Sequence, residues 1–188
     1  SVKKKWGLEK IEGKKRTKII DATYDNVSNR ASYYLFHDIH KGLKINAVAT
    51  TKSGESIDRF KEIIHFSNDL IIHKNELGVH AYSIADKKNI FKNAASIRTK
   101  KIKINGHSRT YFMIVKEGYV SVIWNNKTIL KKPEVDIFIN TSNELIQAGK
   151  EVYNLYDMEG KMMAQNITNY GRLSNYYRSA LYLQHGKD

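Results

Sequence analysis

The stretch EVDIFINTSNELIQAGKEVYNLYD, residues 134–157, decides the fold that the sequence predicts. Its first seven residues alternate polar and apolar side chains, which is typical of a strand with one buried face. Thr141 and Glu144 then have the spacing of a capping box, which satisfies free amides in the first turn of a helix. Apolar residues recur every three or four positions over 145–156, and this period indicates a helix. A strand that leads directly into a helix predicts an α+β protein.

The rest of the chain predicts a mainly antiparallel sheet with two or three helices in total. A second helix is expected at 56–70, where apolar residues again fall on one helical face. A weaker helical spacing follows Gly160. The clearest hairpin joins 110–115 to 119–124, and the single proline should lie at a sheet edge or between strands. Further strands are expected at 17–23, 32–39, 43–50, 79–84 and 127–130. The weaker, third helix would contain Leu173, Tyr176, Tyr177 and Ala180, and the single proline is Pro133.

The bulk composition predicts one domain in a reducing compartment. The chain has 188 residues, 41% of them hydrophobic, and no cysteine, so it can bury a core without disulfides or a thiolate metal site. No internal repeat is evident, and no apolar run predicts a membrane span or a secretory signal. We expect a flexible basic arm over 1–18 and a single α+β domain over 19–188.

The net charge of +13 is concentrated in two segments, 1–18 and 86–109. Concentrated like charge costs stability, so it favours an anionic partner such as the phosphates of RNA or of acidic lipid. A surface charged only for solubility is the alternative. The expected polyanion-binding residues are Lys3, Lys4, Lys5, Lys10, Lys14, Lys15, Arg16 and Lys18 in the first segment, and Lys87, Lys88, Lys92, Arg98, Lys100, Lys101, Lys103 and Arg109 in the second.

Trp6, Leu8 and Ile11 are the large apolar residues of the arm. Tryptophan is a frequent hot-spot residue, so we expect this group to dock on a neighbouring copy and give head-to-tail self-association. Insertion of Trp6 at a lipid headgroup boundary is a second interpretation.

Sequence motifs for catalysis are weak, and we expect no enzyme activity, no cofactor, no metal and no small-molecule substrate. Glu12-Gly13-Lys14 and Glu159-Gly160-Lys161 match the Glu-x-Lys element of metal-dependent nucleases, with Asp136 as the possible metal-holding carboxylate. This pattern is short, so a nuclease is the third choice of function.

The histidines are possible metal ligands. His37 and His40 lie three apart in an expected strand, which puts them on opposite faces and argues against a shared metal. His65 is expected to be packed beside the helix at 56–70.

Aromatic residues beside arginines could stack nucleic-acid bases, although strand alternation favours a core position for one of each pair. These are Tyr111 and Phe112 after Arg109, and Tyr176 and Tyr177 between Arg172 and Arg178.

The order of elements resembles the matrix proteins of rhabdoviruses. The resemblance is carried by KINAVATTKS, residues 44–53, before the first helix and by VDIFINTSNE, residues 135–144, before the second. It implies a viral matrix-type structural protein that condenses a viral ribonucleoprotein, self-associates and binds an acidic membrane surface. The implied locations are the virion, the host cytoplasm and the inner face of the membrane.

The arm has no proline, unlike the animal-virus members with proline-rich budding motifs, so a plant-virus or insect-virus type is the closer fit. The alternative is a stand-alone nucleic-acid-binding accessory or movement protein.

Overall fold

The computed structural model describes residues 4–133, 135–141, 144–172 and 181–185. Over these residues the fold is all-β and contains no helix, so the α+β class predicted from the sequence is wrong. The strands form four antiparallel sheets in this part of the chain. The chain divides into two compact units, Ser1–Ala94 (unit 1) and Ala95–Asp188 (unit 2), where the sequence analysis expects one domain after a short arm.

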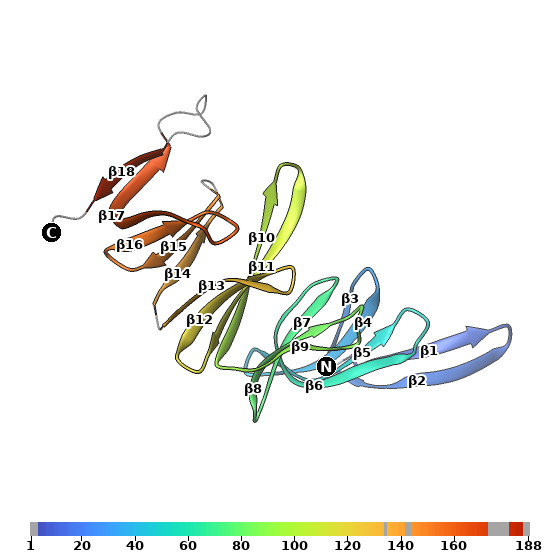
Figure 1. Ribbon diagram of the computed structural model, residues 1–188. Helices are drawn as coiled ribbons and strands as arrows, with labels where there is room; N and C mark the ends of the chain where they lie inside the picture. Colours follow the sequence, from blue (N-terminus) through green and yellow to red (C-terminus); the bar gives the residue numbers. More distant parts are fainter. Residues whose placement is uncertain (1–3, 134, 142–143, 173–180, 186–188) are drawn as a thin grey trace. The chain divides into compact units, whose positions relative to one another are not determined.

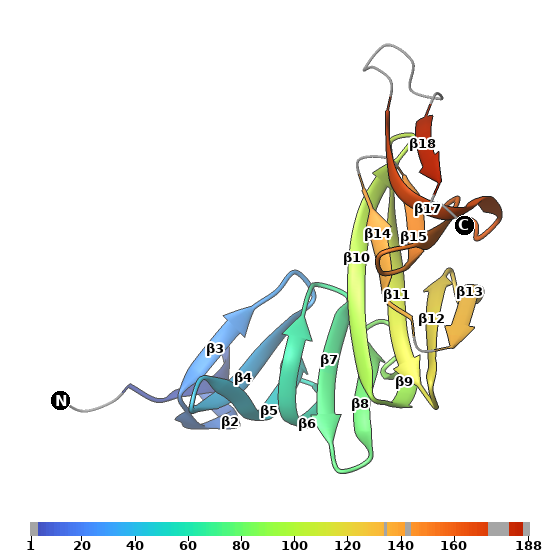
Figure 2. The same ribbon diagram turned by 90° about the vertical axis from the view of Figure 1, so that its left-hand side faces the viewer.

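Unit 1 contains a separate hairpin and a seven-stranded sheet. The hairpin pairs β1 with β2, and the sheet runs in chain order from β3 to β9. Figure 2 shows these seven strands side by side in that order. The strands are β1 (Trp6–Glu12), β2 (Lys15–Tyr24), β3 (Asn26–Asn29), β4 (Tyr33–His40), β5 (Leu43–Thr51), β6 (Ser56–Phe66), β7 (Leu70–Asn75), β8 (Gly78–Ser83) and β9 (Lys88–Ala94).

Unit 2 contains a four-stranded and a five-stranded sheet, each again in chain order. In Figure 1 the first sheet runs from yellow-green at β10 to golden at β13, and the second runs from orange to red. The strands are β10 (Ser96–Ile104), β11 (His107–Lys116), β12 (Tyr119–Trp124), β13 (Lys127–Pro133), β14 (Ile137–Asn140), β15 (Leu145–Gly149), β16 (Tyr153–Tyr156), β17 (Met162–Arg172) and β18 (Leu181–His185).

Two-residue turns connect many of these strands. In four of them both central residues have positive φ, for example 49° and 81° at Lys41-Gly42 and 52° and 74° at Glu117-Gly118. Such turns match the natural twist of paired strands, and they favour Gly and Asn because side chains resist positive φ. The hairpin expected at 110–124 is therefore confirmed, as is the turn at Asn125-Asn126. Pro133 ends β13, an outer strand of its sheet among the described residues.

Five strands begin at similar intervals along the chain. Each of the last four begins 36 to 38 residues after the previous one of the set, and the first four are each followed by a short turn and a further strand. Three or four strands begin within each of these intervals, so the spacing does not define one repeated strand pattern. The first residues of these strands are Tyr33, Leu70, His107, Leu145 and Leu181.

The helix predicted at 56–70 is wrong because strand irregularities imitate a helical period. This segment is β6, whose ladder shifts register between Ala49 and Thr50 of β5 and between Ile63 and His65 facing β7. A bulge adds one residue to a strand, so inward-facing side chains become three apart instead of two. Phe60 and Ile63 are buried as expected, but Ile64 is exposed.

The helix predicted at 141–157 is two strands, β15 and β16. Gly149 has φ 128°, which no α-helix accepts, and its N–H donates to the Asp136 carbonyl at 2.9 Å. Ile146 is fully buried although the helical pattern omits it, and Val152 is 51% exposed although the pattern includes it. The third expected helix, at 173–180, lies outside the described residues. The resemblance to matrix proteins rested on the first two helices, so the fold lends it no support.

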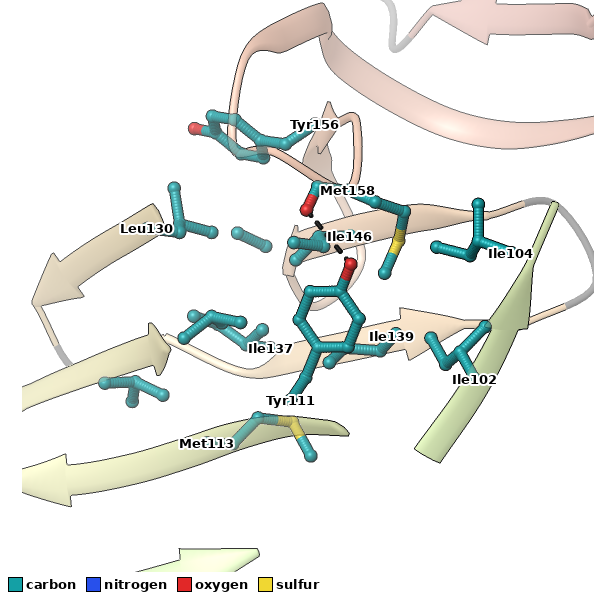
Figure 3. Packing of buried hydrophobic residues seen from close by; sticks show 13 residues of the cluster. Ile102, Ile104, Tyr111, Met113, Leu130, Ile137, Ile139, Ile146, Tyr156 and Met158 are labelled. Carbon is teal, nitrogen blue, oxygen red and sulfur yellow. Dashed lines mark hydrogen bonds between the residues drawn. The ribbon is translucent and has the colours of Figure 1, made fainter. Parts of the chain in front are cut away.

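The cores of the two units consist of side chains from neighbouring strands. In unit 1, Tyr33, Leu35, Ala49, Phe60 and Ile71 are all buried in one cluster. Figure 3 shows the larger cluster in unit 2, where thirteen buried residues of the two sheets meet. At its centre the Tyr111 hydroxyl donates a hydrogen bond to the Met158 carbonyl at 3.3 Å. The sheets of unit 2 therefore share one core.

Buried histidines are a feature of unit 1. His37 is 1% exposed, and neither of its ring nitrogens has a hydrogen-bond partner among the described residues. His73 and His80 stack with ring centroids 5.0 Å apart, and their Nε2 atoms lie 2.9 Å from Asn89 and Asn75 respectively. His65, by contrast, is exposed, so its expected core position is wrong. His40 is exposed and His37 is buried, as the strand alternation predicts.

Unit 1 should lose stability as the pH falls below about 6.5. Burial lowers the pKa of His37 and of His80, and His73 and Lys92 lower that of His80 further. The unfolded chain therefore binds more protons, so this stability is complete above the ordinary pKa of 6.5 and is lost below it. Each histidine contributes a slope of at most about 1.4 kcal/mol per pH unit. Urea unfolding followed at unit 1 amides between pH 7.5 and 5 measures it. His37→Phe should reduce the slope, and an unchanged slope would contradict the assignment.

Substitution of Gly160 should destabilise unit 2 far more than substitution of Gly106. Both glycines have positive φ, 87° and 82°, but a Cβ at Gly160 would lie 2.0 Å from the Ile129 carbonyl oxygen, whereas a Cβ at Gly106 meets no atom within 4 Å. Gly106→Ala should cost about 1 kcal/mol of unfolding free energy through strain alone. Gly160→Ala should cost at least about 3 kcal/mol, because the backbone must also move. Equal urea midpoints for the two variants would disprove this packing.

Candidate polyanion-binding surfaces

Both units carry a net positive charge, and in each it is concentrated in one hairpin. Unit 1 has 18 Lys and Arg against 11 Asp and Glu, a net charge of +7; unit 2 has 14 against 8, a net charge of +6. Residues 1–18 contribute +6 in unit 1. Residues 96–116 contribute six basic and no acidic residues, which equals the whole net charge of unit 2. The basic hairpins are therefore β1–β2 and β10–β11.

The expected flexible arm is a two-stranded hairpin in the structure. Pairing of β1 with β2 extends from Trp6 opposite Tyr24 to Glu12 opposite Lys15, with a turn at Gly13. Its tip projects beyond the rest of unit 1 in Figure 1. Isolated apolar residues among lysines hide this strand pair in the sequence, because neither strand has a continuous buried face. Lys3 lies outside the described residues.

Acidic neighbours neutralise some lysines of the β1–β2 hairpin. Lys5 pairs with Asp25 at 2.9 Å, Lys10 with Glu12 at 2.7 Å and Lys18 with Asp21 at 2.9 Å, all at exposed positions. Exposed ion pairs of this kind are weak and leave the lysines able to bind other anions. Lys4, Lys14, Lys15 and Arg16 make no ion pair with any described residue.

The three apolar residues expected to mediate self-association are exposed to different degrees. Trp6 is 45% exposed and Ile11 is 62% exposed, whereas Leu8 is half-buried opposite Ile20. The β1–β2 ladder shifts register twice between Trp6 and Glu9, so simple alternation does not assign Trp6 and Ile11 to particular faces of β1.

The basic segment at 86–109 is divided between the two units. Lys87 lies in the turn that follows β8, and Lys88 and Lys92 lie on β9, all in unit 1. The remaining members lie on β10 and β11 in unit 2. These members are Arg98, Lys100, Lys101, Lys103 and Arg109.

The β10–β11 hairpin separates its apolar and basic side chains by strand alternation. Ile102 and Ile104 are buried in the core of unit 2, so Lys101 and Lys103 face the other side and are exposed. Lys101 lies opposite Thr110 and Lys103 opposite Ser108, and residues directly opposite share one face. This lysine–hydroxyl face (Lys101, Lys103, Ser108 and Thr110) contains no acidic side chain, and its lysines form no ion pair with any residue that the structure describes.

Arg109 has internal partners and is less available to an anion. Its guanidinium lies 3.2 Å from a Glu159 carboxylate oxygen and 4.2 Å from the centre of the Trp124 ring. Tyr111, two residues on, is fully buried, and Phe112 is half-buried. The expectation that one residue of this aromatic pair belongs to the core is confirmed. The corresponding tyrosines at 176 and 177 lie outside the described residues.

Both Glu-x-Lys elements are turns between strands. Glu12-Gly13-Lys14 joins β1 to β2, and Glu159-Gly160-Lys161 lies in the turn between β16 and β17, where Asp157 Oδ1 accepts hydrogen bonds from the Glu159 and Lys161 amides. In a nuclease the glutamate of this element would bind a metal, but the Glu159 carboxylate pairs with Arg109. Within the described ranges no three acidic or histidine side chains are close enough to hold a metal ion.

Comparisons with known proteins give no family. No protein-family model matches the sequence, and no curated protein matches it. Among the described residues no helix could cross a membrane.

Proposed function

We propose that this chain is a nucleic-acid-binding protein, with RNA of a ribonucleoprotein as its expected partner. The observation that carries the proposal is the lysine–hydroxyl face, where two exposed lysines and two hydroxyl side chains lie on one side of a hairpin with no acidic side chain among them. Charge that no acidic side chain neutralises is the electrostatic feature of nucleic-acid binding. The protein binds and performs no reaction.

The chemistry of this face suits a phosphodiester backbone. Lys101 and Lys103 are two residues apart on one strand, which spaces their Cα atoms by about 6.6 Å. Counterions are released when lysines bind the phosphates, and Ser and Thr hydroxyls donate hydrogen bonds to the phosphate oxygens. The half-buried Phe112 adjoins Thr110 along β11 but offers little open ring surface, so the face reads the backbone rather than the bases.

A second candidate function is that of a coat-forming protein that links ribonucleoprotein to an acidic membrane surface. The observation in its favour is the exposed Trp6 and Ile11 among the lysines of the β1–β2 hairpin. An apolar anchor beside basic residues suits either a second copy of the chain or a lipid headgroup region. Two separate basic hairpins would also let one chain bridge two anionic surfaces.

Neutralising two lysines of the lysine–hydroxyl face should weaken RNA binding. Lys101→Gln/Lys103→Gln should reduce the affinity for single-stranded RNA and lower the slope of log K against log salt by about 1.4, because two phosphate contacts are lost. Fluorescence anisotropy over a salt series measures both quantities. The matched control is Lys127→Gln/Lys150→Gln, which removes the same charge at exposed positions elsewhere in unit 2. If both double variants changed the RNA affinity equally, Lys101 and Lys103 would act only through net charge or by keeping the outer strand β10 from pairing with another chain.

Removal of the tryptophan should weaken self-association if the β1–β2 hairpin docks on a neighbouring copy. We expect Trp6→Ala to form smaller assemblies than the wild-type chain, and added salt to affect assembly less than RNA binding, because the anchor is apolar. Light scattering at matched ionic strength is the measurement. Ile11→Ala is the control at the other exposed apolar residue of β1. Monomers at high concentration in all three proteins, or identical assembly, would exclude docking through Trp6.

A further inference from the structure

Unit 1 contains a polar groove between the β1–β2 hairpin and the seven-stranded sheet. One cavity of about 380 Å³ is lined by Tyr24 and Asp21 of the hairpin region and by Thr50, Ser56 and Arg59 of β5 and β6. A second cavity of about 520 Å³ is also lined by Tyr24, Val48 and Arg59. Shared walls make the two cavities one groove, and its size lies in the range of small-molecule sites.

Strand register explains why polar side chains gather in this groove. Val48 of β5 lies opposite Arg59 of β6, and Thr50 lies opposite Ser56, so these residues share one face of the sheet. The bulge in β6 between these two pairs makes this possible, because it keeps Ser56 and Arg59 on one face although they are three residues apart. The opposite face carries the apolar cluster with Ala49 and Phe60.

Two groups of the groove have unused bonding capacity. The Arg59 guanidinium forms no ion pair or side-chain hydrogen bond with any described residue. Thr50 is 1% exposed, and its Oγ1 has no hydrogen-bond partner in the described part of the chain. A buried hydroxyl without a partner costs stability, so a bound group that reaches it would recover that cost. Asp21 forms an exposed ion pair with Lys18, whereas Arg59 has no ion-pair partner among the described residues.

We propose that this groove binds a small phosphate ester of the size of a nucleotide, with Arg59 as the contact to the phosphate. A guanidinium binds phosphate oxygens in a bidentate manner, and the Thr50 and Ser56 hydroxyls are further donors on the same wall. Tyr24 lines both cavities, and its ring, which is tilted against Phe36 with the ring centroids 6.0 Å apart, is the candidate surface for a planar base. This site goes beyond the proposed RNA-binding role and differs from the expectation that the protein has no small-molecule ligand.

The test is titration of the full-length chain with adenosine 5′-monophosphate, inorganic phosphate and adenosine, followed by amide resonances of β5 and β6. Adenosine 5′-monophosphate should bind saturably and at least tenfold more tightly than adenosine, because the phosphate carries the interaction with Arg59. Arg59→Gln should lower that affinity at least tenfold. Thr50→Val should lower it severalfold without lowering the urea midpoint of the free protein, since the lost hydroxyl has no partner there.

Two control variants separate this proposal from the RNA-binding proposal. Arg30→Gln removes an arginine of unit 1 that lies over the Phe66 ring, outside the groove, and should leave nucleotide affinity unchanged. Lys101→Gln/Lys103→Gln should also leave it unchanged, even if RNA binding is lost. The proposal is overturned by the absence of saturable binding of the nucleotide, by equal affinities for nucleotide and adenosine, or by an unchanged affinity in Arg59→Gln.

Discussion

Hydrogen bonding between strands that are neighbours in the sequence is the interaction on which this structure depends. Each described sheet runs in chain order, so each ladder closes through a nearby connection instead of a long crossover. The tightest connections need two consecutive residues with positive φ, as at Lys41-Gly42 and Asn125-Asn126. Without these turns the partner strands would not align, and neither the cores nor the lysine–hydroxyl face would form.

The same pairing links stability to the candidate binding surface. On β10, Ile102 and Ile104 hold the strand in the core of unit 2, and the residues between them and before them project their charges outward. Because side chains alternate along a strand, the burial of one set fixes the direction of the other. The lysines of the β10–β11 hairpin therefore act from strands that are held in the core of unit 2.

Local turn chemistry was readable from the sequence, whereas strand irregularity was not. The hairpin at 110–124 and the turn at Asn125-Asn126 follow from Gly and Asn between alternating residues, and the charge concentrations were visible in composition. The helices at 56–70 and 141–157 were mispredicted because bulges in β6 and the turn after Gly149 space apolar residues three or four apart. The groove at Arg59 could not be foreseen, since it depends on how β5 and β6 pair and on where the β1–β2 hairpin lies.

Strand pairing in chain order also determines how the molecule yields to a pulling force. A force applied to the two ends would act on hairpins whose strands join at one end, so hydrogen bonds of a ladder would break one after another, as in a zipper. A sheet whose terminal strands pair with each other must instead break many bonds at once. Because each described sheet consists of such hairpins in chain order, extension would proceed in short steps along the chain. A protein of this kind is mechanically compliant even where its individual hairpins are well packed.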